Sequence, residues 1–200
     1  MSSRSKPQRS AQDQFGKVAA SYSTSKTHAR GNGLVSLDSM MTGRHYSIAV
    51  DIGAGPGFSA FAVAPWCDCV IATDVTPQML EQVRSLRNER GAPETEMMLV
   101  AAEALPYTDG SLDLVVSRTA AHHFVDVESW LTEVKRVLAP KGELILIDTV
   151  SPGSAEARTW MHEIELWRDP SHVMNLSIDE WTSAIARAGL RVTSSDTSKV

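Results

Sequence analysis

One stretch constrains the fold of this chain more than any other: residues 50–57, which read Val-Asp-Ile-Gly-Ala-Gly-Pro-Gly and follow a short apolar run from Ser47. Glycine tolerates the positive φ and the close backbone approach that a tight turn requires. A second apolar run ends at Asp74, so a carboxylate is expected at the tip of a neighbouring strand. A strand, a glycine turn that opens a helix, and this carboxylate together predict a site for a nucleoside-containing cofactor.

Apolar runs alternate with helical patterns along the whole chain, and no internal repeat is present. This alternation predicts an α/β fold, a Rossmann-like doubly wound and mostly parallel sheet with helices on both faces. Strands are expected at 47–51, 70–74, 97–101, 112–117, 143–148 and 190–193. Helices are expected at 14–20, 33–41, 58–64, 77–90 and around 130–138, then through Trp160, Ile164 and Trp167, and between Ser177 and Gly189. Residues 140–142 are expected to turn the chain from helix into the fifth strand.

Charge is distributed unevenly. Residues 1–30 hold six Lys or Arg and one Asp, a net charge of +5, and because the total is −5 the remainder carries −10. An acidic body argues against a nucleic-acid surface, and no apolar run approaches the roughly 20 residues of a membrane span. The two cysteines, Cys67 and Cys69, fit reduced core thiols in a cytoplasmic protein.

The spacing of the glycines separates several cofactor classes. A dinucleotide fingerprint would need its third glycine at position 58, where Phe58 stands, and no Gly-Lys-Ser/Thr of a P-loop follows. A carboxylate at the second strand tip can accept hydrogen bonds from both ribose hydroxyls. The pattern therefore favours a nucleoside without a diphosphate, with Asp74 as its ribose partner; a capping role for Asp74 ahead of Pro77 stays open.

Several segments, in this order and spacing, resemble class I S-adenosylmethionine-dependent methyltransferases, nearest the ubiquinone/menaquinone-biosynthesis (type 11) group. They are Val50–Gly57, Asp74, Ala101–Tyr107, Ser111–Val115 and Val137–Leu144. The resemblance runs from about Phe15 to the C-terminus. It implies S-adenosylmethionine as cofactor and methyl transfer to a small-molecule acceptor by in-line displacement.

The resemblance also implies a cofactor-binding set. Tyr22 would close an N-terminal lid, Asp51 belongs to the set, and Gly53, Ala54, Gly55 and Pro56 would line the methionine end. Asp74 would hold the ribose, Val75, Ala102 and Glu103 would flank the adenine, and Ser117 and Arg118 would lie under the methionine moiety. Ala101 departs from the family, which often has Asp or Asn there to bond the adenine amino group. Losing one such hydrogen bond costs roughly 0.5–1.5 kcal/mol, so binding is expected to survive.

Three residues are candidates for catalysis. His123, after the fourth strand, fits a general base near neutral pH, although a capping or packing role for it or its neighbour His122 is the alternative. Asp148, at the end of the fifth strand, could orient a histidine, bond the acceptor or bond a loop, and His172 is a further candidate. A metal site at the histidines is not expected without matched carboxylates. Trp160 and Trp167 are expected in the core or an interface rather than as a substrate platform.

The basic charge at the N-terminus predicts a flexible tail (1–12), and the resemblance implies a single methyltransferase domain (13–200) after it. Within this domain, 13–45 would form the lid helices, 46–150 the cofactor-binding core, and 151–200 the substrate-side helices and sixth strand. The family's sheet ends with a further antiparallel strand beside strand five, which this chain lacks. A fragment, a strand-edge partner or homodimer, and pairing of residues 190–200 with strand five are the three explanations. The alternatives to methyl transfer are a non-catalytic cofactor-binding or interaction protein and an inactive truncated fragment.

Overall fold

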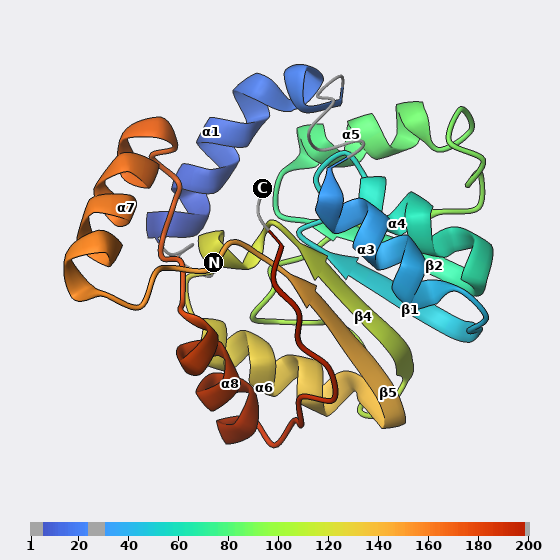
Figure 1. The fold of residues 1–200 in the computed structure, drawn as a ribbon. Coiled ribbons are helices and arrows are strands. Elements are labelled where there is room, and N and C mark those ends of the chain that lie inside the picture. The colour runs from blue at the N-terminus through green and yellow to red at the C-terminus, as the bar shows by residue number, and fades with distance from the viewer. Residues whose placement is uncertain (1–5, 24–30, 199–200) are drawn as a thin grey trace.

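The computed structural model describes residues 6–23 and 31–198. The described residues form a five-stranded sheet in the order β3-β2-β1-β4-β5, and every neighbouring pair is parallel (Figure 1). The strands are β1 (Tyr46–Ile52), β2 (Cys67–Asp74), β3 (Glu96–Leu99), β4 (Leu112–Arg118) and β5 (Leu138–Ile147). The predicted α/β doubly wound class is confirmed.

Helices connect the strands and frame the sheet (Figure 1). They are α1 (Lys6–Ser23), α3 (Asn32–Met41), α4 (Phe58–Val63), α5 (Pro77–Leu86), α6 (Val127–Val137), α7 (Ala155–Arg168) and α8 (Ile178–Arg187), with short 3-10 turns η1 (Ala64–Trp66) and η2 (Ala121–His123). None of the helices in the described ranges is long and apolar enough to cross a membrane.

Two buried clusters lie on opposite faces of the sheet, and β1 shows why. Ala49 packs in the cluster that includes α3, α4 and α5, whereas Val50 packs in the cluster that includes α6 and α8. Successive strand residues point to opposite faces, so a strand that is apolar at consecutive positions must be covered on both sides. This double covering leaves the ends of the strands as the accessible edges of the sheet.

The segment 140–142 does not end the preceding helix as predicted. It lies inside β5, where the pairing of β5 with β4 shifts register between Leu112 and Leu114. A Cβ atom at Gly142 would lie 2.7 Å from the carbonyl oxygen of Leu112. The irregularity is therefore a bulge that requires a glycine because two backbones approach closely.

The predicted sixth strand at 190–193 is wrong. Residues 190–198 form no strand, and so they do not pair with β5. The sequence after Val192 is Thr-Ser-Ser-Asp and is exposed, so it has no apolar face to bury against a neighbour. A short apolar run becomes a strand only when a partner edge accepts its backbone.

The N-terminal boundary also differs from the prediction, because α1 begins at Lys6 inside the segment expected to be a flexible tail. Its sequence before residue 13 is polar but contains good helix formers, and Ala11 and Ala19 are buried. Residues 1–5 of the tail, 24–30 of the predicted lid region and 199–200 lie outside the described residues.

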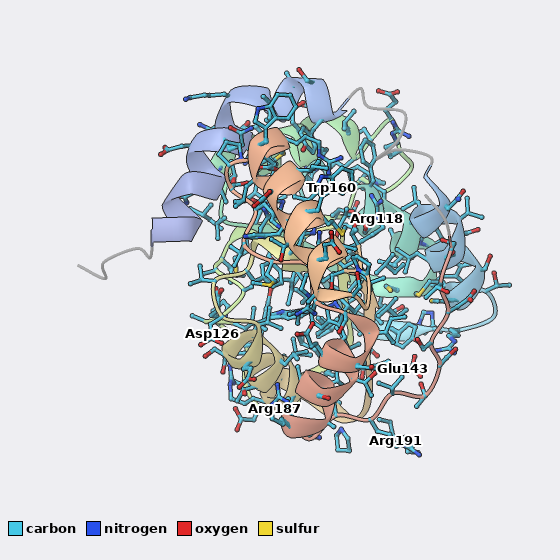
Figure 2. All side chains as sticks on the ribbon, turned by 60° about the vertical axis from the view of Figure 1, so that its left-hand side comes forward. Arg118, Asp126, Glu143, Trp160, Arg187 and Arg191 are labelled. Carbon is cyan, nitrogen blue, oxygen red and sulfur yellow. The ribbon has the colours of Figure 1, made fainter. Side chains whose placement is uncertain are left out.

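The prediction placed Trp160 and Trp167 in the core or an interface, and the core half of it is wrong, whereas the interface stays a prediction. Both lie on α7 and are 67% and 88% exposed; Trp160 is labelled in Figure 2. Ile164 is also exposed, so the apolar stripe that predicted the helix faces away from the sheet. Periodicity identified the helix but not the surface that would cover its apolar side.

Candidate functional site

The glycine turn after β1 is shaped by three glycines with positive φ: Gly53 at 68°, Gly55 at 53° and Gly57 at 90°. A Cβ at Gly53 would lie 2.6 Å from that of Ala120, and one at Gly57 would lie 2.9 Å from the Phe61 ring. A Cβ at Gly55 would meet no atom within 4 Å. Gly53 and Gly57 thus allow tight packing, whereas Gly55 borders open space at the carboxyl edge of the sheet.

Asp74 holds this turn from the tip of β2. Its Oδ2 accepts a hydrogen bond from the amide of Gly55 at 2.9 Å, and its Oδ1 accepts one from the amide of Thr76 at 2.8 Å. Burial raises the pKa of the Asp74 carboxyl, and the amide hydrogen bonds oppose that rise. The carboxylate therefore fixes the turn and the segment before α5. The N-cap of α5 is Thr76, so the capping alternative for Asp74 is wrong.

Asp51 contributes to the site differently from the rest of the expected set. It is 1% exposed, and its Oδ2 accepts from the amide of Ala60 at 2.9 Å in the first turn of α4. The cap residue Gly57 has no side chain to do so, so Asp51 stabilises this helix start. Burial raises the Asp51 pKa to about 7, although the charge of Arg118 opposes the shift.

Other members of the expected set use their side chains inside the protein. Ser117 donates to the carbonyl of Ile52 at 3.0 Å, and Arg118 donates to Ser59 at 2.9 Å. Glu103 accepts from the amide of Val125 at 3.0 Å. Ala54 donates its amide to Thr73, Pro56 and Ala102 are buried, and Ala101 is half-buried. The cofactor roles of these residues stay predictions.

Helix α1 extends across the carboxyl edge of the sheet, toward which the β4 and β5 arrows point (Figure 1). In the middle of this helix, Gln12 donates to the carbonyl of Val75, just after β2. Further along the helix, the ring centroid of Phe15 lies 5.0 Å from that of His123 and 5.5 Å from that of Tyr22. Burial, followed by the charge of Asp169, raises the pKa of Tyr22. The helix thus joins the cofactor side of the site to its histidine side.

Asp148 directly follows β5, and its carboxylate contacts the side chain of His122. Their Nδ1 and Oδ1 atoms lie 2.6 Å apart, and the side chains are 15% and 2% exposed. The other oxygen of Asp148 accepts the backbone amide of His122 at 3.1 Å. Burial lowers the pKa of His122, but the charge and hydrogen bond of Asp148 outweigh it, so the net pKa is raised.

His123 has a different environment. Its Nδ1 lies 3.1 Å from the carbonyl of Ser171. Burial and the neighbouring charge of His122 lower the pKa of His123 to about 4. A base needs a pKa near the working pH, so this geometry favours His122 over His123 as a proton acceptor. The sequence did not separate these neighbours, because their directions depend on the 3-10 turn η2 in which both lie.

His172 extends the cluster. Its ring centroid lies 5.6 Å from that of His122 and 5.4 Å from that of His162 on α7. Burial, with the charges of His122 and His123, lowers its pKa to about 4. In the part of the chain that the structure describes, no group of three or more His, Cys, Asp or Glu residues could hold a metal ion.

Thr119 joins the two halves of the site and was not singled out in the sequence. It has a φ of 55°, which is unfavourable for a β-branched residue. Its amide donates to the carbonyl of Ile147 at 2.7 Å, and His122 and Asp148 lie just beyond these two residues. Strained backbone of this kind gathers at functional sites.

Comparison with known proteins agrees with this geometry. A family model described as a methyltransferase domain matches residues 50–146. The uncharacterized methyltransferase YcgJ of Bacillus subtilis is 35% identical over 167 residues, covering 84% of this chain and 66% of YcgJ. The YcgJ crystal structure aligns with a TM-score of 0.74 at 33% identity, over 78% of this chain and 67% of YcgJ. This chain belongs to the methyltransferase family.

Two further proteins support the membership. The uncharacterized protein YafE of Escherichia coli is 36% identical over 148 residues, covering 74% of this chain and 72% of YafE. The fold is also that of an S-adenosylmethionine-dependent methyltransferase from Aquifex aeolicus, with a TM-score of 0.68 at 18% identity over 90% of each chain. The Aquifex aeolicus structure bears on the fold alone, and the predicted family membership is confirmed by the family model and by YcgJ.

Proposed function

We propose that this chain transfers a methyl group from S-adenosylmethionine to a small-molecule acceptor. The observation that carries the proposal is the pairing of Asp74 with the amide of Gly55, at 2.9 Å, beside the open side of the glycine turn. This arrangement lies at the carboxyl edge of a parallel sheet, the edge at which such folds bind their ligands.

The residues present fit this cofactor. The Asp74 carboxylate accepts the amides of Gly55 and Thr76, and in this proposal it also accepts a ribose hydroxyl. The open face of Gly55 leaves room for a ligand that approaches the backbone. S-adenosylmethionine, when bound, supplies a methyl group that its sulfonium has already activated.

His122 is the best-placed proton acceptor for an acceptor molecule that must lose a proton. Because Nδ1 donates to Asp148, the neutral ring carries its free lone pair on Nε2. Asp148 fixes this tautomer and stabilises the protonated ring once a proton has been taken up. In this proposal Asp148 is a positioning residue, and His123 and His172 surround His122 without replacing it.

A small acceptor fits the enclosure of this region. Helix α1 contacts both Val75 and His123. The histidines behind it are largely buried: the His122 and His123 side chains are 15% and 13% exposed. The net charge of −10 over residues 31–200 adds to the argument against a nucleic-acid substrate.

Calorimetry with S-adenosylmethionine and S-adenosylhomocysteine tests the cofactor half of the proposal. Asp74→Asn should weaken binding of both at least about tenfold, since it removes a charged acceptor of ribose hydroxyls. Asp113→Asn is the matched control, because Asp113 also accepts two backbone amides, those of Ser47 and Ile48, near the opposite strand ends. Absence of binding by the wild-type chain would overturn the proposal.

The rival is a cofactor-binding protein without catalysis. Incubation with methyl-labelled S-adenosylmethionine and a panel of phenols, amines and enolisable carbon acceptors distinguishes the two. The proposal expects label in at least one acceptor and a large loss with His122→Asn. Tight cofactor binding with no transfer to any member of the panel favours the rival.

A further inference from the structure

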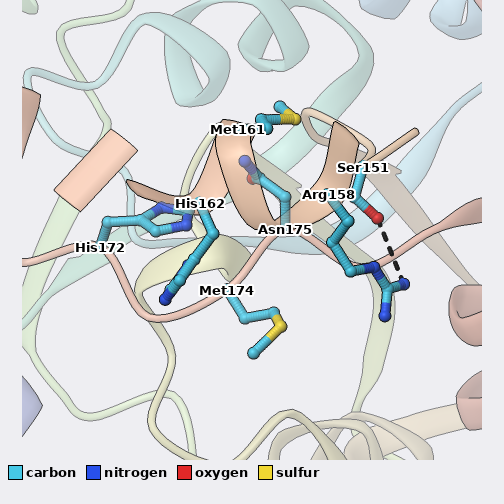
Figure 3. A pocket seen from close by; sticks show the side chains of 7 residues that line it. All are labelled: Ser151, Arg158, Met161, His162, His172, Met174 and Asn175. Atoms are coloured by element: carbon cyan, nitrogen blue, oxygen red, sulfur yellow. Dashed lines mark hydrogen bonds between the residues drawn. The ribbon is translucent and has the colours of Figure 1, made fainter. Parts of the chain in front are cut away.

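A small enclosed space lies against α7, and no residue of the glycine turn lines it (Figure 3). Its volume is about 10 Å³, enough for about one water-sized group. The lining residues come from α7, from the segment before it and from the segment after it. They are Ser151, Arg158, Met161, His162, His172, Met174 and Asn175.

Two of the lining side chains are buried and lack partners for polar atoms. His172 is 5% exposed and Asn175 is 6% exposed. Neither Nε2 of His172 nor Oδ1 of Asn175 has a hydrogen-bond partner among the described residues. Nδ1 of His162, on the same lining, has none either. An unsatisfied buried polar atom costs about 1–3 kcal/mol, so these atoms define a place for a polar ligand group.

The chemistry of the unpartnered atoms selects the group. Oδ1 of Asn175 is a carbonyl oxygen and requires a donor. A neutral His172 ring offers either a donor or an acceptor at Nε2. The one charged lining residue, Arg158, is already paired with Glu180 on α8. A neutral hydroxyl, which donates and accepts through one oxygen, meets these requirements, whereas an anion would lack a free cation.

The rest of the lining is apolar and adaptable. Met161 and Met174 bring flexible thioether side chains to the same space, and Met174 is 43% exposed. No residue of α7 is buried, so a movement of this helix would expose no core side chain. His172 has two neighbours of interest: it lines this space, and its ring centroid is 5.6 Å from that of His122, the proposed proton acceptor.

We propose that His172 and Asn175 form a subsite that binds a hydroxyl group of an apolar methyl acceptor. The inference rests on the proposed function, because it assigns this hydroxyl to the acceptor. His172 lines the subsite and His122 does not, so the bound hydroxyl anchors the acceptor and is not the atom that is methylated.

Phenol and toluene test the subsite, since they have nearly the same shape and differ in the hydroxyl. Each is titrated into the full chain carrying ¹³C-labelled histidine, with and without S-adenosylhomocysteine, and the His172 resonance is assigned with His172→Gln. Phenol should shift His172 and bind at least about tenfold more tightly than toluene, because only phenol satisfies the two unpartnered atoms. Equal binding of the two, or no His172 shift at the solubility limit of phenol, overturns the inference.

Two variants locate the effect. Asn175→Leu keeps the approximate size of the side chain, removes the carbonyl, and should bring the phenol-to-toluene ratio close to one. Met174→Leu changes the apolar wall and should leave the ratio as in the wild type. A crystal structure with phenol in which a water molecule bridges His172 and Asn175, and phenol is bound elsewhere, also overturns the inference. Failure of the chain to bind S-adenosylhomocysteine counts against the proposed function, whereas the phenol preference is measured independently of it.

Discussion

The Asp148 carboxylate lies 2.6 Å from Nδ1 of His122 and accepts the backbone amide of the same residue. One side chain at the tip of β5 thus fixes both the position and the tautomer of an imidazole on the loop after β4. The contact is nearly removed from water, since Asp148 is 2% exposed. A buried charge that lacks its partner is strongly destabilising, so the two residues function as a unit.

Asp148→Asn should lower the pKa of His122, because burial then acts without the opposing charge. The titration of the His122 ring by NMR measures this directly. Glu128→Gln controls for the change in net charge, since Glu128 pairs with Arg187 on the exposed side of α6. An unchanged His122 titration in Asp148→Asn would show that the pair does not set this pKa.

The lowered pKa of His172, about 4, has a consequence for stability. Between this value and the unfolded value of about 6.5, the unfolded chain binds a proton at His172 that the folded chain does not, so acidification favours unfolding. Stability of the wild type relative to His172→Gln should fall by about 1–2 kcal/mol from pH 7.5 to pH 5. Urea unfolding of the wild type and of His172→Gln at both pH values measures this change. Asp51, whose pKa is raised, contributes to stability with the opposite pH dependence, and this contribution cancels because both proteins contain Asp51. A difference independent of pH would contradict the assignment.

Gly142→Ala should destabilise the fold by about 1–3 kcal/mol, since the added Cβ would press against the carbonyl of Leu112. Chemical unfolding measures the loss. Gly153→Ala is the matched control, because a Cβ there meets nothing within 4 Å, and it should change stability by less than about 0.5 kcal/mol. Equal effects of the two substitutions would remove the close approach at the bulge as the reason for Gly142.

Thr119→Asn should stabilise the fold by about 0.5–1 kcal/mol, because asparagine tolerates the left-handed region that a β-branched residue disfavours. Thr193→Asn, at an exposed position without positive φ, should be close to neutral. Thermal unfolding of the two variants checks the comparison. If Thr119 holds His122 and Asp148 in place through strain, the same variant also broadens or shifts the His122 resonance.

Much of the candidate site around the glycine turn and Asp74 could be predicted from the sequence. Strong local signals fix it: three glycines after an apolar run, Asp74 after the next, and Pro77 in the first turn of α5. Each signal depends on backbone chemistry within a few residues, and so the strands β1, β2 and β4 lie within a few residues of their predicted bounds.

The part of the candidate site around the histidines was harder to predict, because it depends on packing between distant segments. The different environments of His122 and His123 are set by Asp148 and Ser171, neither of which is a sequence neighbour. The failed strand at 190–193 has the same origin, since an apolar run cannot reveal whether a partner edge exists. Trp160 and Trp167 show that a helical stripe does not specify what covers it.

A crystal structure of the chain with S-adenosylhomocysteine would show whether Asp74 holds the ribose. We expect the ribose hydroxyls on Asp74, the ligand against the open face of Gly55, and His122 still paired with Asp148. A ligand bound elsewhere, or a ribose that makes no contact with Asp74, would contradict this expectation.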